Sequence, residues 1–324
     1  MSTRSVAART FTAGAITLAV LAVLVVGGVL VLREFVDPFS GEPVCTAEVD
    51  GTSTVLELEQ ARYAATIAAV SVQRGLPARA ASIALATAFQ ESKIVNIDYG
   101  DRDSLGLFQQ RPSQGWGSPS QIMDPYYATN RFYSALEQVD GYRSLPIDEA
   151  AQMVQRSADG RAYAAHETRA RTLASALTGF SPAAFSCEVE PPSPSAKGPD
   201  AKGLTPRAQA VRREVESAFG DVPQGGFAPD GVQSGHQQGS AHYDGRAVDF
   251  FFRPVNDANN RRGWALAHFL VAQAERMAIS TVIFDDRIWT AARSDQGWRE
   301  YNEGSGSGDP DIRRHLDHVH VDVA

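Results

Sequence analysis

The feature that most constrains this chain is an uninterrupted apolar run from Thr10 to Leu32. The run contains no acidic, basic or carboxamide side chain and no proline. As a helix that rises ~1.5 Å per residue it would span roughly 34 Å, which is enough to cross a ~30 Å hydrocarbon core. We therefore expect a single transmembrane helix at residues 10–32, behind a tail at residues 1–9.

The charges that flank this run predict its orientation. Arg4 and Arg9 precede the run, whereas Arg33 is followed at once by acidic residues. Because the cationic flank stays in the cytoplasm, we expect a single-pass protein of the cell membrane with a cytoplasmic N-terminus and an extracytoplasmic bulk. A cleaved signal peptide is the alternative, but its apolar region is about 7–15 residues long and ends at a small-x-small site. This run closes on Val29–Leu32 instead.

Length and charge limit the domains and the partners. The residues behind the run suffice for two ordinary domains. The net charge of −8 disfavours binding to a polyanion, so we expect no nucleic-acid partner. The sequence identifies no protein partner.

The chain contains two cysteines, Cys45 and Cys187, which bracket the first folded segment. An isolated pair in an oxidising compartment predicts a disulfide, and two unrelated thiols are the alternative. Closing so long a loop would stabilise the fold by roughly 5 kcal/mol at most.

Helical spacing dominates residues 54–187, which follow a polar spacer at residues 33–53. Apolar residues recur at this spacing from Val55 to Leu76 and again from Ala78 to Ser92. Helical patterns return in three later segments: Tyr126–Gln138, Ile147–Ser157 and Tyr163–Leu177. The stretch from Val95 to Gln121 is rich in Asp, Gly, Ser and Gln, which predicts loops and short strands. We expect a mainly α domain.

A linker at residues 188–204 separates this domain from a second one at residues 205–324. The linker is rich in Pro, Ser, Gly and Lys. A helix is predicted at Thr205–Phe219, capped by Thr205 before Pro206. Further along come three predicted strands and one helix: strands Arg246–Phe252, Ser280–Phe284 and His318–Val323, and helix Arg262–Met277. We expect an α+β domain.

The strongest chemical signal lies in this second domain. The segment from Ser240 to Asp249 reads SAHYDGRAVD, and the segment from Asp317 to His320 reads DHVH. Residues i and i+2 of a strand share a face, so His318 and His320 are predicted to point into one site. Two imidazoles and a carboxylate are a common set of ligands for a catalytic zinc, and they leave a fourth position for a water whose pKa falls to about 7.

These two motifs resemble those of the zinc peptidases of the D-alanyl-D-alanine carboxypeptidase, lysostaphin and hedgehog-like group, over most of residues 205–324. The resemblance implies Zn2+ as the cofactor and three metal ligands: His242, Asp249 and His320. It makes His318 the catalytic imidazole, while Asp317 matches the acidic general base of the carboxypeptidase branch. A flat strand turns Asp317 away from its neighbour, so His318 is slightly favoured as the base.

The loop before His242 departs from that pattern. Many relatives carry an arginine there, whereas this chain has Ser234-Gly235-His236-Gln237. Polarisation of the substrate therefore has no assigned residue. We expect His236 and His315 to be structural or peripheral.

A second constellation lies in the first domain. Glu91 is near the end of the predicted helix Ala78–Ser92, and the segment Gly106–Gln110 follows it. A carboxylic acid at the end of an apolar helix is partly desolvated, which raises its pKa toward the range needed to protonate a glycosidic oxygen. An exposed glutamate that merely ends a helix is the alternative.

The Glu-Ser pair and the later SLGLFQQ resemble the signature of lysozyme-like lytic transglycosylases over roughly residues 55–177, with Phe108 in place of the usual methionine. The resemblance implies that Glu91 is the acid that later acts as the base. It places four residues along a glycan groove: Ser104, Gln109, Gln110 and Tyr163. Tyr99 and Trp116 are candidates for stacking on the sugar rings. Three aspartates could supply a second carboxylate, although turn formation is their expected role: Asp98, Asp101 and Asp103.

The two resemblances converge on one polymer. They predict a membrane-anchored bifunctional peptidoglycan hydrolase of a Gram-positive bacterium. The first domain would cleave glycan strands, as a lytic transglycosylase or glycosidase, and the second would hydrolyse peptide stems, as a zinc-dependent carboxypeptidase or endopeptidase. The alternative is a non-catalytic or singly active cell-wall-binding scaffold protein.

Overall fold

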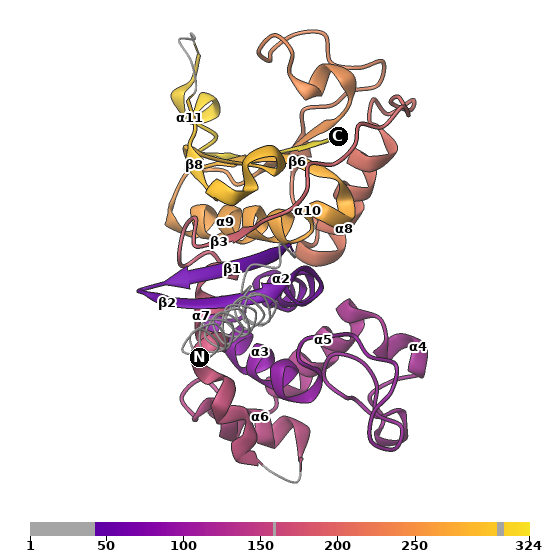
Figure 1. Cartoon of the computed structure of the whole chain (residues 1–324), viewed down its shortest axis with the longest axis vertical. Helices are drawn as coiled ribbons and strands as arrows, with labels where there is room; N and C mark the ends of the chain where they lie inside the picture. The colour runs from indigo at the N-terminus through magenta and orange to yellow at the C-terminus, as the bar shows by residue number, and fades with distance from the viewer. Residues whose placement is uncertain (1–42, 158–159, 303–307) are drawn as a thin grey trace, which may run out of the picture. The chain divides into compact units, whose positions relative to one another are not determined.

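The structure of the protein is a computed structural model that describes residues 43–157, 160–302 and 308–324. The described chain is α+β, with two antiparallel sheets and the helices that pack around them (Figure 1).

The predicted membrane helix at Thr10–Leu32 lies outside the described residues. Across the part of the chain that the structure does describe, no helix combines the length and apolar character that a bilayer crossing requires. The described residues form an α+β fold, which corrects the predicted fold class, and the predicted single-pass location at the cell membrane is withdrawn.

A three-stranded sheet opens the described chain, in the order β2 (Thr52–Glu57), β1 (Val44–Val49), β3 (Phe185–Cys187). The predicted polar spacer and the helical start at Val55 are wrong here. Val55 is 60% exposed and Leu56 2% exposed, which is the period of a strand rather than of a helix. The expectation of a mainly α first domain is corrected accordingly.

The predicted disulfide joins two of these strands. Cys45 on β1 and Cys187 on β3 are register partners, their Cα atoms lie 3.9 Å apart, and their sulfurs are bonded. The bond ties the first strand of the described chain to the segment that follows the last helix of this half.

The helices of the first half surround one buried helix, α3 (Ala78–Ser92), whose bounds match the prediction. Every residue from Ala80 to Phe89 is buried, because small alanine side chains let neighbouring helices approach from all sides. These neighbours are α2 (Leu58–Gln73), α5 (Pro125–Leu136), α6 (Ile147–Gln155) and α7 (Glu167–Leu177). The left-handed Lys93, with φ 57°, ends α3 and leaves Glu91 where the chain emerges from the core.

The stretch between α3 and α5 is irregular, as the sequence predicts. It contains the short helices η1 (Pro112–Gln114) and α4 (Pro119–Ile122) and one isolated bridge between Leu105 and Gln110. The hydroxyl of Ser92 donates to the carbonyl of Leu107 over 2.8 Å. This bond holds the irregular loop against the end of α3, beside Glu91.

A six-stranded sheet forms the second half. Its order is β4 (Gln224–Gly225), β5 (Ala247–Phe251), β9 (His318–Val323), β6 (Ile279–Phe284), β7 (Arg287–Thr290) and β8 (Arg299–Glu300). Its helices are α8 (Pro206–Phe219), α9 (Asp257–Ala272), α10 (Ala274–Met277) and α11 (Pro310–Arg313). Thr205 caps α8 as predicted, since its hydroxyl accepts from the backbone N–H of Ala208.

Residues 188–204 contain no helix or strand, yet packing crosses this predicted linker. Helix α2 packs against α8 and α9, and one hydrophobic cluster extends over both halves. His268 on α9 also donates from Nδ1 to the carbonyl of Ala176 on α7 over 2.8 Å. The two halves therefore share a core.

Candidate functional site

The candidate metal centre lies where β5, β9 and η3 (Ala241–Asp244) meet. Asp249 on β5 and His320 on β9 are register partners on adjacent strands, and His242 approaches them from η3. Nε2 of His242 lies 3.3 Å from Oδ1 of Asp249 and 3.1 Å from Nδ1 of His320. The last pair, Nδ1 of His320 and Oδ1 of Asp249, is 2.9 Å apart. This buried group could hold a metal ion.

The donor set fits a small tetrahedral ion. Metal bonds of about 2.0–2.1 Å in a tetrahedral arrangement place the ligand atoms about 3.3 Å apart, close to the separations observed here. The opposite ring nitrogens are also held: Nδ1 of His242 donates to the carbonyl of Gly226 over 2.7 Å, and Nε2 of His320 donates to Asp322 over 2.8 Å. With a metal ion bound in place of the ring proton of His320, these two bonds would fix the tautomers in which Nε2 of His242 and Nδ1 of His320 carry the lone pairs that face the centre.

Gly226 shapes the back of this centre. Its φ is +78°, and an added Cβ would lie 2.2 Å from Cε1 of His242 and 2.8 Å from Oδ2 of Asp249. Any side chain would therefore push into the ligands. No sequence pattern singles out Gly226, because the surrounding loop is rich in glycine and only the fold shows which one faces the donors.

Electrostatics make the centre attractive to a cation. Burial acts to raise the pKa of Asp249, but hydrogen bonds with His242 and His320 outweigh it and lower the pKa below its usual value. Burial acts to lower the pKa of His320, but Asp322 and Asp249 outweigh it and raise the pKa to about 10. Asp249 and Asp322 are therefore both ionised. Their negative charges favour binding of a divalent cation at the centre.

His318 stands beside the three donors and is held by Asp317. Nδ1 of His318 donates to Oδ1 of Asp317 over 2.7 Å, and Nε of Arg253 donates to Oδ2 of Asp317 over 2.6 Å. Nε2 of His318 faces the centre, 3.9 Å from Oδ1 of Asp249. Of the two predicted candidates for the base, His318 therefore presents its ring to the centre and Asp317 lies behind it.

The charge state of Asp317 supports this arrangement. Burial acts to raise its pKa, but hydrogen bonds from His318 and Arg253 outweigh it and hold the pKa below the usual range. An ionised Asp317 with both oxygens engaged can orient His318, but it has no oxygen left facing the centre.

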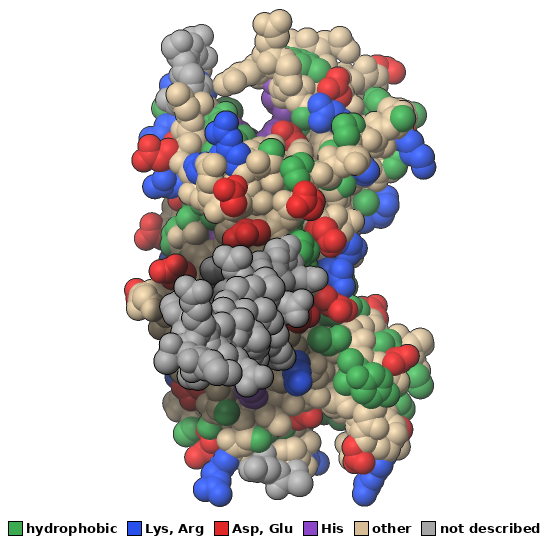
Figure 2. Space-filling view, in the orientation of Figure 1, with side chains coloured by type: hydrophobic (Ala, Val, Ile, Leu, Met, Phe, Trp, Pro, Cys, Tyr) green, Lys and Arg blue, Asp and Glu red, His purple; other side chains and the backbone are tan. Residues whose placement is uncertain are grey.

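The centre opens into a cavity of about 600 Å³, and Figure 2 shows histidine side chains in a hollow of this half. His236 and His315, expected to be peripheral, both line it. The ring of His236 stacks on His242 at 3.9 Å, and the ring of His315 lies 4.6 Å from His318. Burial, then repulsion from His318 and His320, lowers the pKa of His315 to about 3, which keeps it neutral.

The second candidate site is Glu91 at the end of α3. Tyr163, on η2 (Gly160–His166), is fully buried, and its hydroxyl donates to Oε1 of Glu91 over 2.6 Å. Burial, followed by the bond to Glu91, raises the pKa of Tyr163 well above its usual value, so the phenol stays a donor. The structure thus places this predicted groove residue directly against the predicted acid.

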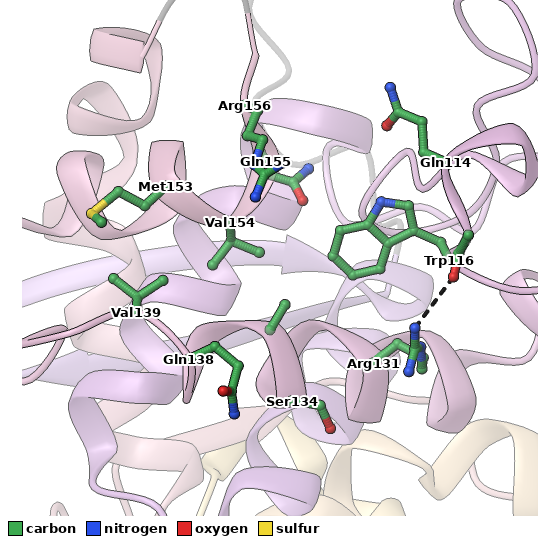
Figure 3. A pocket seen from close by; sticks show the side chains of 12 residues that line it. Gln114, Trp116, Arg131, Ser134, Gln138, Val139, Met153, Val154, Gln155 and Arg156 are labelled. Carbon is green, nitrogen blue, oxygen red and sulfur yellow. Dashed lines mark hydrogen bonds between the residues drawn. The ribbon is translucent and has the colours of Figure 1, made fainter.

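The other residues predicted to line the glycan groove differ in burial and in location. Gln110 is 2% exposed and donates to the carbonyl of Ala128, and Ser104 is also buried. Gln109 donates to the carbonyl of Tyr99, whose ring is exposed. Trp116 lines a separate cavity of about 830 Å³, which Glu91 does not line (Figure 3).

Of the three aspartates that follow Glu91, two are exposed and one is engaged within a turn. Asp98 and Asp101 are exposed. Asp103 accepts hydrogen bonds from Arg111 and from the backbone and hydroxyl of Ser113, which hold its pKa below the usual range. Its carboxylate therefore organises a turn, the role that the sequence favours.

Residues 200–311 match a family model described as VldE, C-terminal domain. The matched segment contains His242 and Asp249 and ends before His318 and His320. No curated protein matches the chain.

Proposed function

We propose that this chain is a bifunctional peptidoglycan hydrolase. Its C-terminal half would hydrolyse peptide stems with zinc, and its N-terminal half would cleave glycan strands. The observation that carries the proposal is the buried group of His242, Asp249 and His320, with His318 held beside it by Asp317.

Zinc suits this centre because two imidazoles and one carboxylate are a usual catalytic zinc set that keeps one position open. When bound, zinc would supply a Lewis acid for the peptide carbonyl and the attacking water. Nε2 of His318 would accept the proton of that water and return it to the leaving amine. Asp317 would hold the Nδ1–H tautomer of His318 and stabilise its protonated form.

Arg253 gives the centre the cation that the loop before His242 lacks. It lines the same cavity, its side chain is 51% exposed, and its Nε is bound to Asp317. Its terminal guanidinium nitrogens would bind a carbonyl or carboxylate of the peptide stem. Polarisation of the substrate, which no residue of the upstream loop could be assigned, would come from this arginine.

Glycan cleavage would rest on Glu91 alone. Its carboxyl group would protonate the glycosidic oxygen and then take a proton back, while Tyr163 positions it by the 2.6 Å hydrogen bond. The engagement of Asp103 and the exposure of Asp98 and Asp101 support a mechanism without a second carboxylate, as in lytic transglycosylases, where the substrate's acetamido group takes part.

Muropeptide mapping tests both halves. Purified walls would be digested by the wild type, Glu91→Gln and His242→Ala, with Glu48→Gln as an exposed control, and the products identified by mass spectrometry. We expect Glu91→Gln to lose only anhydro-muramyl ends and His242→Ala to lose only shortened or separated stems. A chelator should reproduce the second loss, and added zinc should reverse it. Wild-type product patterns from both variants would refute the proposal.

One observation favours a second candidate, in which only the zinc half is catalytic and the helical half grips glycan. Gln110, predicted to line the groove, is buried and bound to the carbonyl of Ala128 instead. In that case the wild type would release stem products and bind walls without forming anhydro-muramyl ends.

A further inference from the structure

A cavity of about 830 Å³ in the first half is built by α5, α6 and the loop that carries Trp116 (Figure 3). Figure 3 shows Trp116 and Arg131 on one side, facing Val154, Gln155 and Arg156 on the other. Among the residues that line it, only Trp116 belongs to the glycan groove implied by the resemblance to lytic transglycosylases.

The charged side chains that line this cavity are all positive. Arg131 on α5 and Arg156 at the end of α6 line it, and no acidic side chain among the described residues does. Within the same residues neither guanidinium forms an ion pair, and Nη2 of Arg131 donates to the carbonyl of Gly115 over 3.3 Å. Two arginines in a concave site, with no counter-ion among the described residues, favour an anionic ligand, above all carboxylates, which they can bind in bidentate fashion.

The remaining lining suits an amphipathic ligand. Trp116, Val139 and Val154 offer apolar surface, and Met153 is 50% exposed. Three glutamines add neutral hydrogen-bonding groups: Gln114, Gln138 and Gln155. Apolar walls with a few polar groups are typical of sites that bind ring or peptide ligands by several small contacts.

The cavity adjoins the Glu91 site by two connections. Gln155, in its wall, donates to the carbonyl of Phe108, and the preceding carbonyl of Leu107 accepts from Ser92, the neighbour of Glu91. On the other side Ser157, which follows Arg156, hydrogen-bonds with Tyr163. These hydrogen bonds link the wall of the cavity to the segments that carry Glu91 and its partner Tyr163.

We propose that this cavity binds the carboxylates of a peptide stem on the glycan strand that Glu91 cleaves. This inference rests on the proposed glycan-cleaving function and names what the enzyme recognises beside the sugar rings. Arg131 and Arg156 bind the stem carboxylates, and Trp116 packs against the apolar part of the same muropeptide. The glycan half is thereby selective for strands whose stems are present and carry free acids.

Binding of three probes to the full chain tests the site. Calorimetry in the Glu91→Gln background, which prevents turnover, would use N-acetylmuramyl-L-alanyl-D-glutamate, its fully amidated form and an N-acetylglucosamine oligomer. We expect the free acid to bind at least tenfold more tightly than the amide, and the difference to shrink with added salt. Equal affinity for acid and amide would overturn the proposal without any further variant.

Variants of the two arginines test whether these side chains cause the preference for the free acid. Arg131→Gln and Arg156→Gln should each weaken binding of the free acid several-fold and the double variant at least tenfold, with the amide little changed. Arg143→Gln, an exposed arginine outside the cavity, is the matched control. Unchanged affinity in the double variant would refute the assignment.

The two proposals fail in different ways. If anhydro-muramyl ends form but acid and amide bind alike, the stem site alone is wrong. If the acid binds selectively but Glu91→Gln leaves glycan cleavage intact, the proposed role of Glu91 is wrong and the stem site stands as a binding site.

Discussion

The hydroxyl of Tyr163 lies 2.6 Å from Oε1 of Glu91, and burial keeps this phenol protonated as a donor. The contact joins η2 to the end of α3, two elements far apart in the sequence. It fixes the direction in which the carboxyl group of Glu91 points, which a helix terminus alone would not do.

Tyr163→Phe should lower the rate of glycan cleavage by about 10-fold, because the carboxyl group of Glu91 loses the hydrogen bond that positions it. The measurement is the release of anhydro-muramyl ends from purified walls. Tyr63→Phe, a more exposed tyrosine at the surface of α2, serves as the control. A Tyr163→Phe rate equal to that of Tyr63→Phe would show that the contact has no catalytic role.

Asp317→Asn should reduce stem hydrolysis by roughly 10²-fold or more, because His318 loses the carboxylate that fixes its tautomer. Zinc content should stay near the wild-type value, since Asp317 is not among the grouped donors. Rate and metal content would be measured on the same samples, with the exposed Asp295→Asn as control. Loss of zinc together with activity would instead identify Asp317 as part of the metal centre.

Gly226→Ala should weaken zinc binding by about 10–100-fold, because the added methyl group would meet Cε1 of His242 at 2.2 Å. Gly231→Ala is a matched control: its φ of +82° is equally unfavourable for alanine, but its methyl group would meet only Nε2 of Gln233, at 3.7 Å. Competition with a zinc indicator gives both affinities. Equal losses of zinc affinity in the two variants would show that backbone strain, rather than contact with His242, causes the effect.

The buried His268 should make stability depend on pH. Burial lowers its pKa from 6.5 to about 4, and the hydrogen bond to Ala176 offsets this only in part. Between these values the unfolded chain binds a proton at this position and the folded chain does not. The free energy of unfolding therefore falls as the pH drops from 6.5 to about 4, by about 3 kcal/mol in total, and the contribution levels off below that.

His268→Asn tests this dependence, since asparagine retains an N–H donor for the carbonyl of Ala176 but does not titrate. Urea unfolding from pH 7 to pH 4 should show the stability curves of wild type and variant converging as the pH falls. Parallel curves across this window would mean that His268 does not carry the pH dependence.

Removal of the disulfide by Cys45→Ser together with Cys187→Ser should lower the free energy of unfolding by about 2–5 kcal/mol. The bond joins register partners on β1 and β3, which the rest of the first half separates in sequence. Urea unfolding measures the loss, and the wild type under reducing conditions should reproduce it. Equal stability of all three samples would contradict the prediction.

Local patterns in the sequence were sufficient for several elements. The alanine-rich, apolar segment of α3 has the predicted bounds, Thr205 caps α8, and the alternation along β9 points His318 and His320 into one cavity. These features depend on neighbours a few residues apart, so their physical causes are contained in the sequence itself. The pairing of Cys45 and Cys187 followed from there being no other cysteine in the chain.

The tertiary structure decided what distant segments do to one another. Val55 and Leu56 fit a helix or a strand in isolation, and pairing with β1 selected the strand. The sequence favoured His318 over Asp317 only slightly, and the decisive contact is that of Arg253, which follows a different strand, engages Asp317 and leaves His318 facing the donors. Sequence alone thus determined which residue types are available and their local periodicity. Only the packing of strands and loops that are remote in the chain set which of them meet, because such contacts depend on long-range pairing and burial, which no short window of sequence contains.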